Sequence, residues 1–141
     1  MIKTPKLHAG DTGLACALLG LDAAALGKDR ATLGHLLETF VYQELRRQAG
    51  WRASTIGFHH YRDKDGAEVD IVLEHGAREV AGIEVNASAT VTAADFRGLL
   101  KLAAAAGKRF TTGVVLYGGE ATAGFGDGLY AVPIRRLWET T

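Results

Sequence analysis

The sequence predicts one α/β domain over residues 1–141, with a mixed central sheet flanked by helices. Three observations support this fold class: an amphipathic helix of about four turns, two alternating strands that follow it, and a later strand with a continuous apolar run. The predicted order is helices, three strands in a meander, a helix and two strands, which is typical of α/β folds. The helix after Asn86 is expected to make a crossover, so that the strands on either side of it pair in parallel.

The first 50 residues are predicted to be mainly helical. Asp11–Gly13 is typical of a turn or cap, and a short apolar helix is expected after it, over Leu14–Leu21. Gly27–Asp29 interrupts the chain. Apolar residues at three- and four-residue spacing then predict an amphipathic helix over 33–48, which ends at Gly50.

The middle of the chain is predicted to form the meander. Residues 51–61 are rich in aromatic and β-branched side chains, which favour a strand, and they lead into Asp63–Gly66, a strong hairpin signal. Two alternating strands follow, over 67–74 and 80–87, with a turn at His75 and Gly76.

The last third is predicted to add one helix and two strands to the sheet. Thr90 or Thr92 is expected to cap a helix that ends at Gly107. A buried strand, a glycine-rich loop, a short strand ended by proline and a closing helix or turn are then expected over 110–117, 118–128, 129–132 and 134–138.

Composition narrows the classes of function. The 16 basic and 16 acidic residues cancel, so binding to nucleic acid would depend on a local basic patch. The lone Cys16 cannot form an internal disulfide, and no secretory signal is recognisable, so the cytoplasm is the expected compartment. No apolar run approaches the ~20 residues that span a membrane, and no membrane association is expected.

Acidic residues on the two alternating strands are the most informative feature. A period of two places one set of side chains on one face, Ala67, Val69, Ile71 and Leu73, and a second set on the other, Glu68, Asp70, Val72 and Glu74. In the next strand Glu84 and Asn86 share a face. If the turn pairs the strands, Asp70 and Glu84 lie roughly 5 Å apart at Cβ. Two carboxylates at that separation repel unless a divalent cation or a proton lies between them. The alternative is an ordinary solvated sheet face.

A third acid, Glu38, lies beside the apolar stripe of the long helix. It comes one turn after Gly34, whose missing side chain is expected to let the helix approach the sheet closely. Glu38 is therefore expected to reach the same site, and the alternative is that it is a surface residue.

The chain resembles the C-terminal domain of unknown function of a bacterial and archaeal family of AAA+ ATPases, which belongs to the PD-(D/E)XK, or restriction-endonuclease-like, nucleases. Seven phrases carry the resemblance in order: Asp11–Leu14, Leu37–Leu45, Tyr61–Asp63, Glu68–Asp70, Ile83–Val85, Asp95–Leu99 and Val132–Trp138. The resemblance implies a restriction-endonuclease-like three-layer sandwich. It also implies DNA as a substrate or ligand, with a separate AAA+ ATPase module or another protein as partner, because the chain has no Walker motif.

The resemblance further implies a catalytic set of Glu38, Asp70, Glu84 and the residue at 86. Asp70, Glu84 and the carbonyl of Val85 would bind Mg²⁺ or Mn²⁺, and Glu38 would hold a water. Family members usually have a lysine where this chain has Asn86. Two functions remain open: Mg²⁺-dependent phosphodiester hydrolysis, with Lys64, Arg97 or Lys101 replacing the missing charge, or a catalytically inactive module that binds nucleic acid or a protein.

Overall fold

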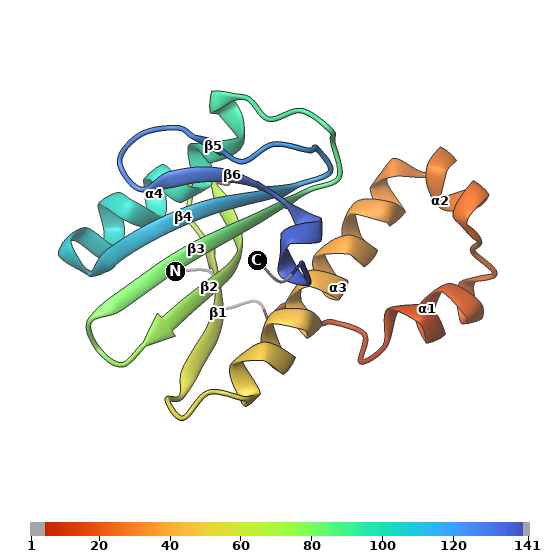
Figure 1. Ribbon diagram of the computed structural model, residues 1–141, viewed down its shortest axis with the longest axis horizontal. Coiled ribbons are helices and arrows are strands. Elements are labelled where there is room, and N and C mark those ends of the chain that lie inside the picture. The colour runs from red at the N-terminus through yellow and green to blue at the C-terminus, as the bar shows by residue number, and fades with distance from the viewer. Residues whose placement is uncertain (1–4, 140–141) are drawn as a thin grey trace.

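The computed structural model describes residues 5–139 and arranges them around one six-stranded mixed sheet (Figure 1). The strands lie in the spatial order β1 (Ile56–Arg62), β2 (Glu68–His75), β3 (Glu79–Asn86), β4 (Phe110–Tyr117), β6 (Leu129–Pro133) and β5 (Ala123–Gly124). The first three strands are antiparallel neighbours, β3, β4 and β6 are parallel neighbours, and β5 is an antiparallel edge. The predicted meander and the predicted parallel pairing across the crossover are confirmed.

Helices cover the sheet on both faces. Helix α4 (Arg97–Ala106) packs on one face, where Leu99 and Leu102 join Val69 and Val72 in a buried cluster. Helix α3 (Arg30–Gly50) packs on the other face, where Val41 joins a second cluster with Ile71, Ile83 and Leu116. The described part of the chain therefore forms three layers, with one apolar core on each side of the sheet.

The N-terminal helices α1 (Thr12–Leu19) and α2 (Ala23–Lys28) project from the sheet beside α3 (Figure 1). Asp11, Asp22 and Asp29 cap α1, α2 and α3 in turn, because each carboxylate accepts a hydrogen bond from a backbone N–H three residues later. No residue of α1 or α2 is buried. No helix in the part of the chain that the structure describes is long and apolar enough to cross a membrane.

Short 3₁₀ turns complete the chain: η1 (Ala93–Phe96), η2 (Gly107–Arg109) and η3 (Ile134–Leu137). The helix start near Thr92 is confirmed, since Asp95 Oδ2 accepts hydrogen bonds from the backbone N–H of Thr92 at 2.7 Å and from its hydroxyl at 3.2 Å. Helix α2 and the two-residue strand β5 were not predicted, and β1 begins at Ile56, five residues later than expected.

The predicted alternation along β2 is wrong at Asp70. Tyr61 pairs with Val69 and His59 with Val72, so β2 has one more residue than β1 over this stretch. This is a β-bulge. It puts Val69 and Val72 on the α4 face and Ile71 on the α3 face. The bulge changes the direction of the side chain of Asp70, which follows Val69 in the sequence. Asp70 is the central residue of the site.

Candidate functional site

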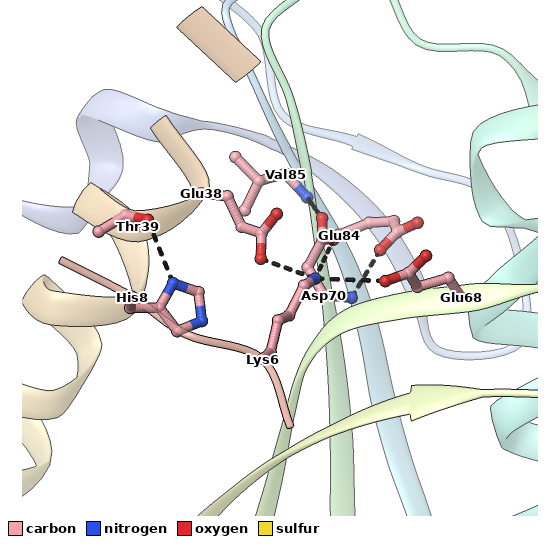
Figure 2. Close-up of polar contacts among 8 residues, drawn as sticks. All are labelled: Lys6, His8, Glu38, Thr39, Glu68, Asp70, Glu84 and Val85. Atoms are coloured by element: carbon pink, nitrogen blue, oxygen red, sulfur yellow. Dashed lines mark hydrogen bonds and ion pairs between the residues drawn. The ribbon is translucent and has the colours of Figure 1, made fainter. Parts of the chain in front are cut away.

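The carboxylates of Asp70 and Glu84 each accept a hydrogen bond from a backbone N–H of the neighbouring strand (Figure 2). The backbone N–H of Asp70 donates to Glu84 Oε2 at 2.9 Å, and the backbone N–H of Val85 donates to Asp70 Oδ2 at 2.9 Å. We call this pair the carboxylate fork. The β2–β3 ladder runs only from Ile71 opposite Ile83 to His75 opposite Glu79. Beyond the ladder, the side chains of Asp70 and Glu84 accept hydrogen bonds from backbone N–H groups. In a longer ladder these N–H groups would pair with the opposite strand.

The fork holds a cationic side chain that the sequence reasoning missed. Lys6 Nζ lies 3.1 Å from Asp70 Oδ1, 2.7 Å from Glu38 Oε1 and 3.4 Å from Glu68 Oε1 (Figure 2). Glu38 comes from α3 and the other two acids come from β2. The expectation that Glu38 lies beside the two strand acids therefore agrees with the geometry, and Lys6 is the group that links them.

Gly34 does not contribute to this arrangement in the way expected. A Cβ placed on Gly34 would have no atom within 4 Å, so its missing side chain allows no close approach to the sheet. The glycine that does allow one is Gly98, near the start of α4. A Cβ there would lie 1.9 Å from the carbonyl oxygen of Glu68, so only glycine lets α4 lie against this end of β2.

Residues 5–9, which we call the strap, are anchored to α3 by polar and aromatic contacts. His8 Nδ1 lies 3.2 Å from Thr39 Oγ1, and the His8 ring stacks on Tyr42 with 4.3 Å between centroids. The Gln43 amide donates a hydrogen bond to the carbonyl oxygen of Ala9 at 2.8 Å. His8 and Ala9 are two and three residues from Lys6, so their contacts fix where the Lys6 side chain enters the fork.

Two carboxyl groups of the site, those of Glu84 and Glu38, have raised pKa values. Burial and the charge of Asp70 raise the pKa of Glu84 to about 8. Burial also raises the pKa of Glu38, with the charges of Asp70 and Glu68 adding to it and Lys6 opposing it. Glu38 Oε1 is buried and has no partner of hydrogen-bond geometry among the described residues, although the Lys6 ammonium is 2.7 Å away.

The site favours the protonated, positively charged form of Lys6. Burial lowers the pKa of Lys6, but its contacts with Glu38 and Asp70 outweigh burial and leave the pKa above its ordinary value. Among the described residues, the ion pairs of Glu38, Glu68 and Asp70 are all with this one ammonium, and Glu84 forms none. One ammonium is therefore shared by three acids, and the site favours further positive charge or protons.

The side chain of Asn86 is bound at both ends by groups outside the fork. Its amide donates to Asp95 Oδ1 at 3.0 Å, and its carbonyl oxygen accepts from the backbone N–H of Ser88 at 2.8 Å. A pocket of about 400 Å³ opens beside it, and its lining includes Glu68, Glu84 and Arg97.

Of the basic residues considered as replacements, Arg97 lines the pocket itself. Lys101 Nζ lies 3.7 Å from Asp63 and 3.6 Å from Asp65, so the structure places it at the hairpin between β1 and β2. Arg97 therefore shares a pocket with Glu68 and Glu84.

The donor set of the fork fits Mg²⁺ or Mn²⁺ better than a softer metal. Asp70, Glu84 and the carbonyl of Val85 supply hard oxygen ligands, and Mg²⁺ is commonly bound through one or two carboxylates while it keeps several waters. In residues 5–139 no three His, Cys, Asp or Glu side chains are grouped so that they could hold a metal by themselves. Water and substrate oxygens would have to complete the coordination, and Glu38, whose Oε1 lies 2.7 Å from the Lys6 ammonium, is a further acid nearby.

The sequence carried almost no signal for Lys6. It lies in an irregular segment, so periodicity does not assign it to a face, and it is separated from Asp70 by 64 positions. The one available hint was a lysine immediately after Thr4-Pro5, in a stretch with no helical or strand pattern.

Comparison with known proteins matched one family. No curated protein and no solved structure matched the chain. The sequence model of a domain of unknown function, DUF4143, matches residues 33–137, which include most of α3, the carboxylate fork and the whole sheet. The chain therefore belongs to the DUF4143 family.

Proposed function

We propose that this domain is a nuclease-like, DNA-associated module that hydrolyses phosphodiester bonds with Mg²⁺ or Mn²⁺. The observation that carries the proposal is the carboxylate fork, in which Asp70 and Glu84 are locked together by backbone hydrogen bonds and lie in a site short of positive charge. Two carboxylates so fixed are preorganised ligands for a hard divalent ion. Restriction-endonuclease-like architecture and service to an AAA+ ATPase module are parts of the same proposal, and the resemblance along the chain supports both.

The proposed ion would be held by Asp70, Glu84 and the carbonyl of Val85. It supplies Lewis-acid chemistry, which lowers the pKa of a bound water and stabilises negative charge on the phosphate. Glu38, which shares the Lys6 ammonium with Asp70, would orient that water by accepting its hydrogen bond. Arg97, which lines the adjacent pocket, would bind a phosphate of the DNA backbone.

Asn86 limits the expected rate. An amide can donate a hydrogen bond but brings no charge, and this amide already donates to Asp95. Loss of one preorganised electrostatic group commonly costs ~10²- to 10³-fold in rate. We therefore expect slow cleavage by the natural sequence, and the Asn86→Lys variant should cleave DNA about 10²-fold faster.

The test is cleavage of single-stranded, linear duplex and supercoiled DNA with Mg²⁺ and with Mn²⁺. Asp70→Asn in the Asn86→Lys background is the matched control, because it keeps the shape of the fork and removes its charge. Cleavage that appears with Asn86→Lys and disappears in the double variant is the expected result. If Asn86→Lys cleaves none of the three DNA forms with either metal, the hydrolytic proposal is wrong.

A second candidate function is a binding module without catalysis. It is favoured by two contacts: the amide of Asn86 is bound to Asp95, and the ammonium of Lys6 lies against Asp70. This candidate predicts DNA binding that survives Asp70→Ala and weakens steeply with salt. Absence of DNA binding at low salt would leave a protein partner as the remaining ligand.

A further inference from the structure

The strap places the ammonium of Lys6 against the oxygen of Asp70 that a metal would need. Asp70 Oδ2 already accepts a hydrogen bond from the backbone of Val85. The other oxygen, Oδ1, lies 3.1 Å from Lys6 Nζ. Both oxygens of this carboxylate therefore have a partner. One of the two partners, Lys6, has a long, flexible side chain and belongs to an irregular segment.

A divalent ion and the Lys6 ammonium cannot bind Asp70 Oδ1 together without strong repulsion. Two cations within a few ångströms in a partly buried site repel by several kcal/mol even at an effective dielectric constant of ~20. The backbone hydrogen bonds at the fork hold Asp70 in place, whereas Lys6 is a long side chain whose exposed fraction is 25%. The ammonium is thus the group that has to move.

We propose that the strap is a built-in competitor of the divalent ion: Lys6 occupies the fork when no ion is bound and withdraws when one binds. This proposal rests on the proposed metal site and adds a way of regulating metal binding there. Occupied by Lys6, the fork is an autoinhibited form of the domain. The anchors at His8 and Ala9 keep the strap close, so that Lys6 can return when the ion leaves.

The first measurement is calorimetric titration of the full chain with Mn²⁺. Lys6→Gln should bind Mn²⁺ about tenfold or more tightly than the natural sequence, because the competing charge is gone. Lys6→Arg should bind like the natural sequence, because it keeps the charge. Lys108→Gln is the control for net charge: Lys108 is exposed, has no ion pair among residues 5–139, and should change the affinity less than about twofold.

The second measurement follows the Lys6 amine directly in the natural sequence. Acetylation by an N-hydroxysuccinimide ester, read by mass spectrometry, should be slow at Lys6 without metal and become several-fold faster at saturating Mn²⁺. Acetylation of Lys108 in the same sample should not change. This readout needs no variant, so it holds even if Lys6→Gln folds poorly.

The outcomes separate the two proposals. Mn²⁺ binding that is equal or weaker in Lys6→Gln, or acetylation of Lys6 that saturating Mn²⁺ leaves slow, would overturn the competitor while the metal site survives. A Lys6 that stays in place and is needed only for cleavage would instead be a positioning residue, which also overturns it. Absence of Mn²⁺ binding by both the natural sequence and Lys6→Gln would overturn the metal site and the competitor together.

Discussion

Helix α4 and the helix pair α1–α2 are both rich in alanine and leucine, yet they are placed in opposite ways. Helix α4 buries Leu99 and Leu102 against the sheet. In α1, Leu14 and Leu18 are 60% and 79% exposed, and no residue is buried. The difference shows that apolar composition alone does not put a helix into a core, because the apolar residues must also meet a complementary face.

This contrast bears on the site because α4 lies against one side of it, whereas the strap, which precedes α1, lies on the other. Gly98 seats α4 directly on the backbone at Glu68, which fixes the sheet side of the site. On the other side, the strap is held by a histidine contact, an aromatic stack and a hydrogen bond to its backbone. The α4 side of the site is thus formed by close packing, and the strap side is held by a few polar and aromatic contacts. Such contacts can break singly, which a Lys6 that leaves the fork would need.

The largest expected effect contrasts one leucine from each region. Leu99→Ala should lower the free energy of unfolding by about 3–4 kcal/mol, because a fully buried side chain leaves a cavity. Leu18→Ala should change it by less than about 0.5 kcal/mol, because that side chain is exposed. Urea unfolding of the two variants gives both values. A cost for Leu18→Ala above about 1 kcal/mol would mean that α1 is packed in solution.

The next effect contrasts two helical glycines. Gly98→Ala should cost about 2–3 kcal/mol, since its Cβ would meet the carbonyl oxygen of Glu68 at 1.9 Å and α4 would have to shift. Gly34→Ala meets nothing and should stabilise the protein by about 0.5–1 kcal/mol through helix propensity. Thermal unfolding of the pair measures the difference, and equal melting temperatures would contradict the seating of α4.

A further effect is the pH dependence of stability without metal. The pKa of Glu84 rises from 4.5 to about 8 on folding, so the folded state keeps a proton that the unfolded chain loses. The contribution of Glu84 to stability is then fully present below pH 4.5 and is lost as the pH rises from 4.5 through 8. The raised pKa of Lys6 does not oppose this loss, because Lys6 is charged in both states over that range.

Urea unfolding in the presence of a chelator measures this dependence. Glu84→Gln is the matched variant, since it keeps the shape of the side chain and cannot ionise. Its stability should vary less with pH between 4.5 and 8 than that of the natural sequence. A natural sequence that becomes more stable over this range would contradict the raised pKa of Glu84.

The sequence predicted the parts of the fold and the site that depend on local periodicity. Alternation placed Glu84 and Asn86 on one face of β3, and the crossover rule predicted the parallel pair β3–β4. Helical spacing placed Glu38 on a helix that does reach the acids. Each of these inferences uses only residues within one element or one turn, where chain geometry is nearly fixed.

The remaining features depend on contacts between distant segments, which no spacing rule specifies. The extra residue at Asp70 breaks the period of two, because a bulge is defined by its partner strand. Lys6 reaches the fork across 64 positions from an irregular segment. Asn86 differs from the lysine that the resemblance led us to expect, but only the structure shows that its amide is bound to Asp95.

The most direct test of the central claim, that the fork is a divalent-cation site, is a crystal structure of the full chain soaked in Mn²⁺ and recorded for anomalous scattering. A divalent cation bound in the fork should give one anomalous peak about 2 Å from carboxylate oxygens of Asp70 and Glu84, with the Lys6 ammonium moved away from Asp70. Absence of a peak at saturating Mn²⁺, with Lys6 still bound between Asp70 and Glu38, would contradict this claim.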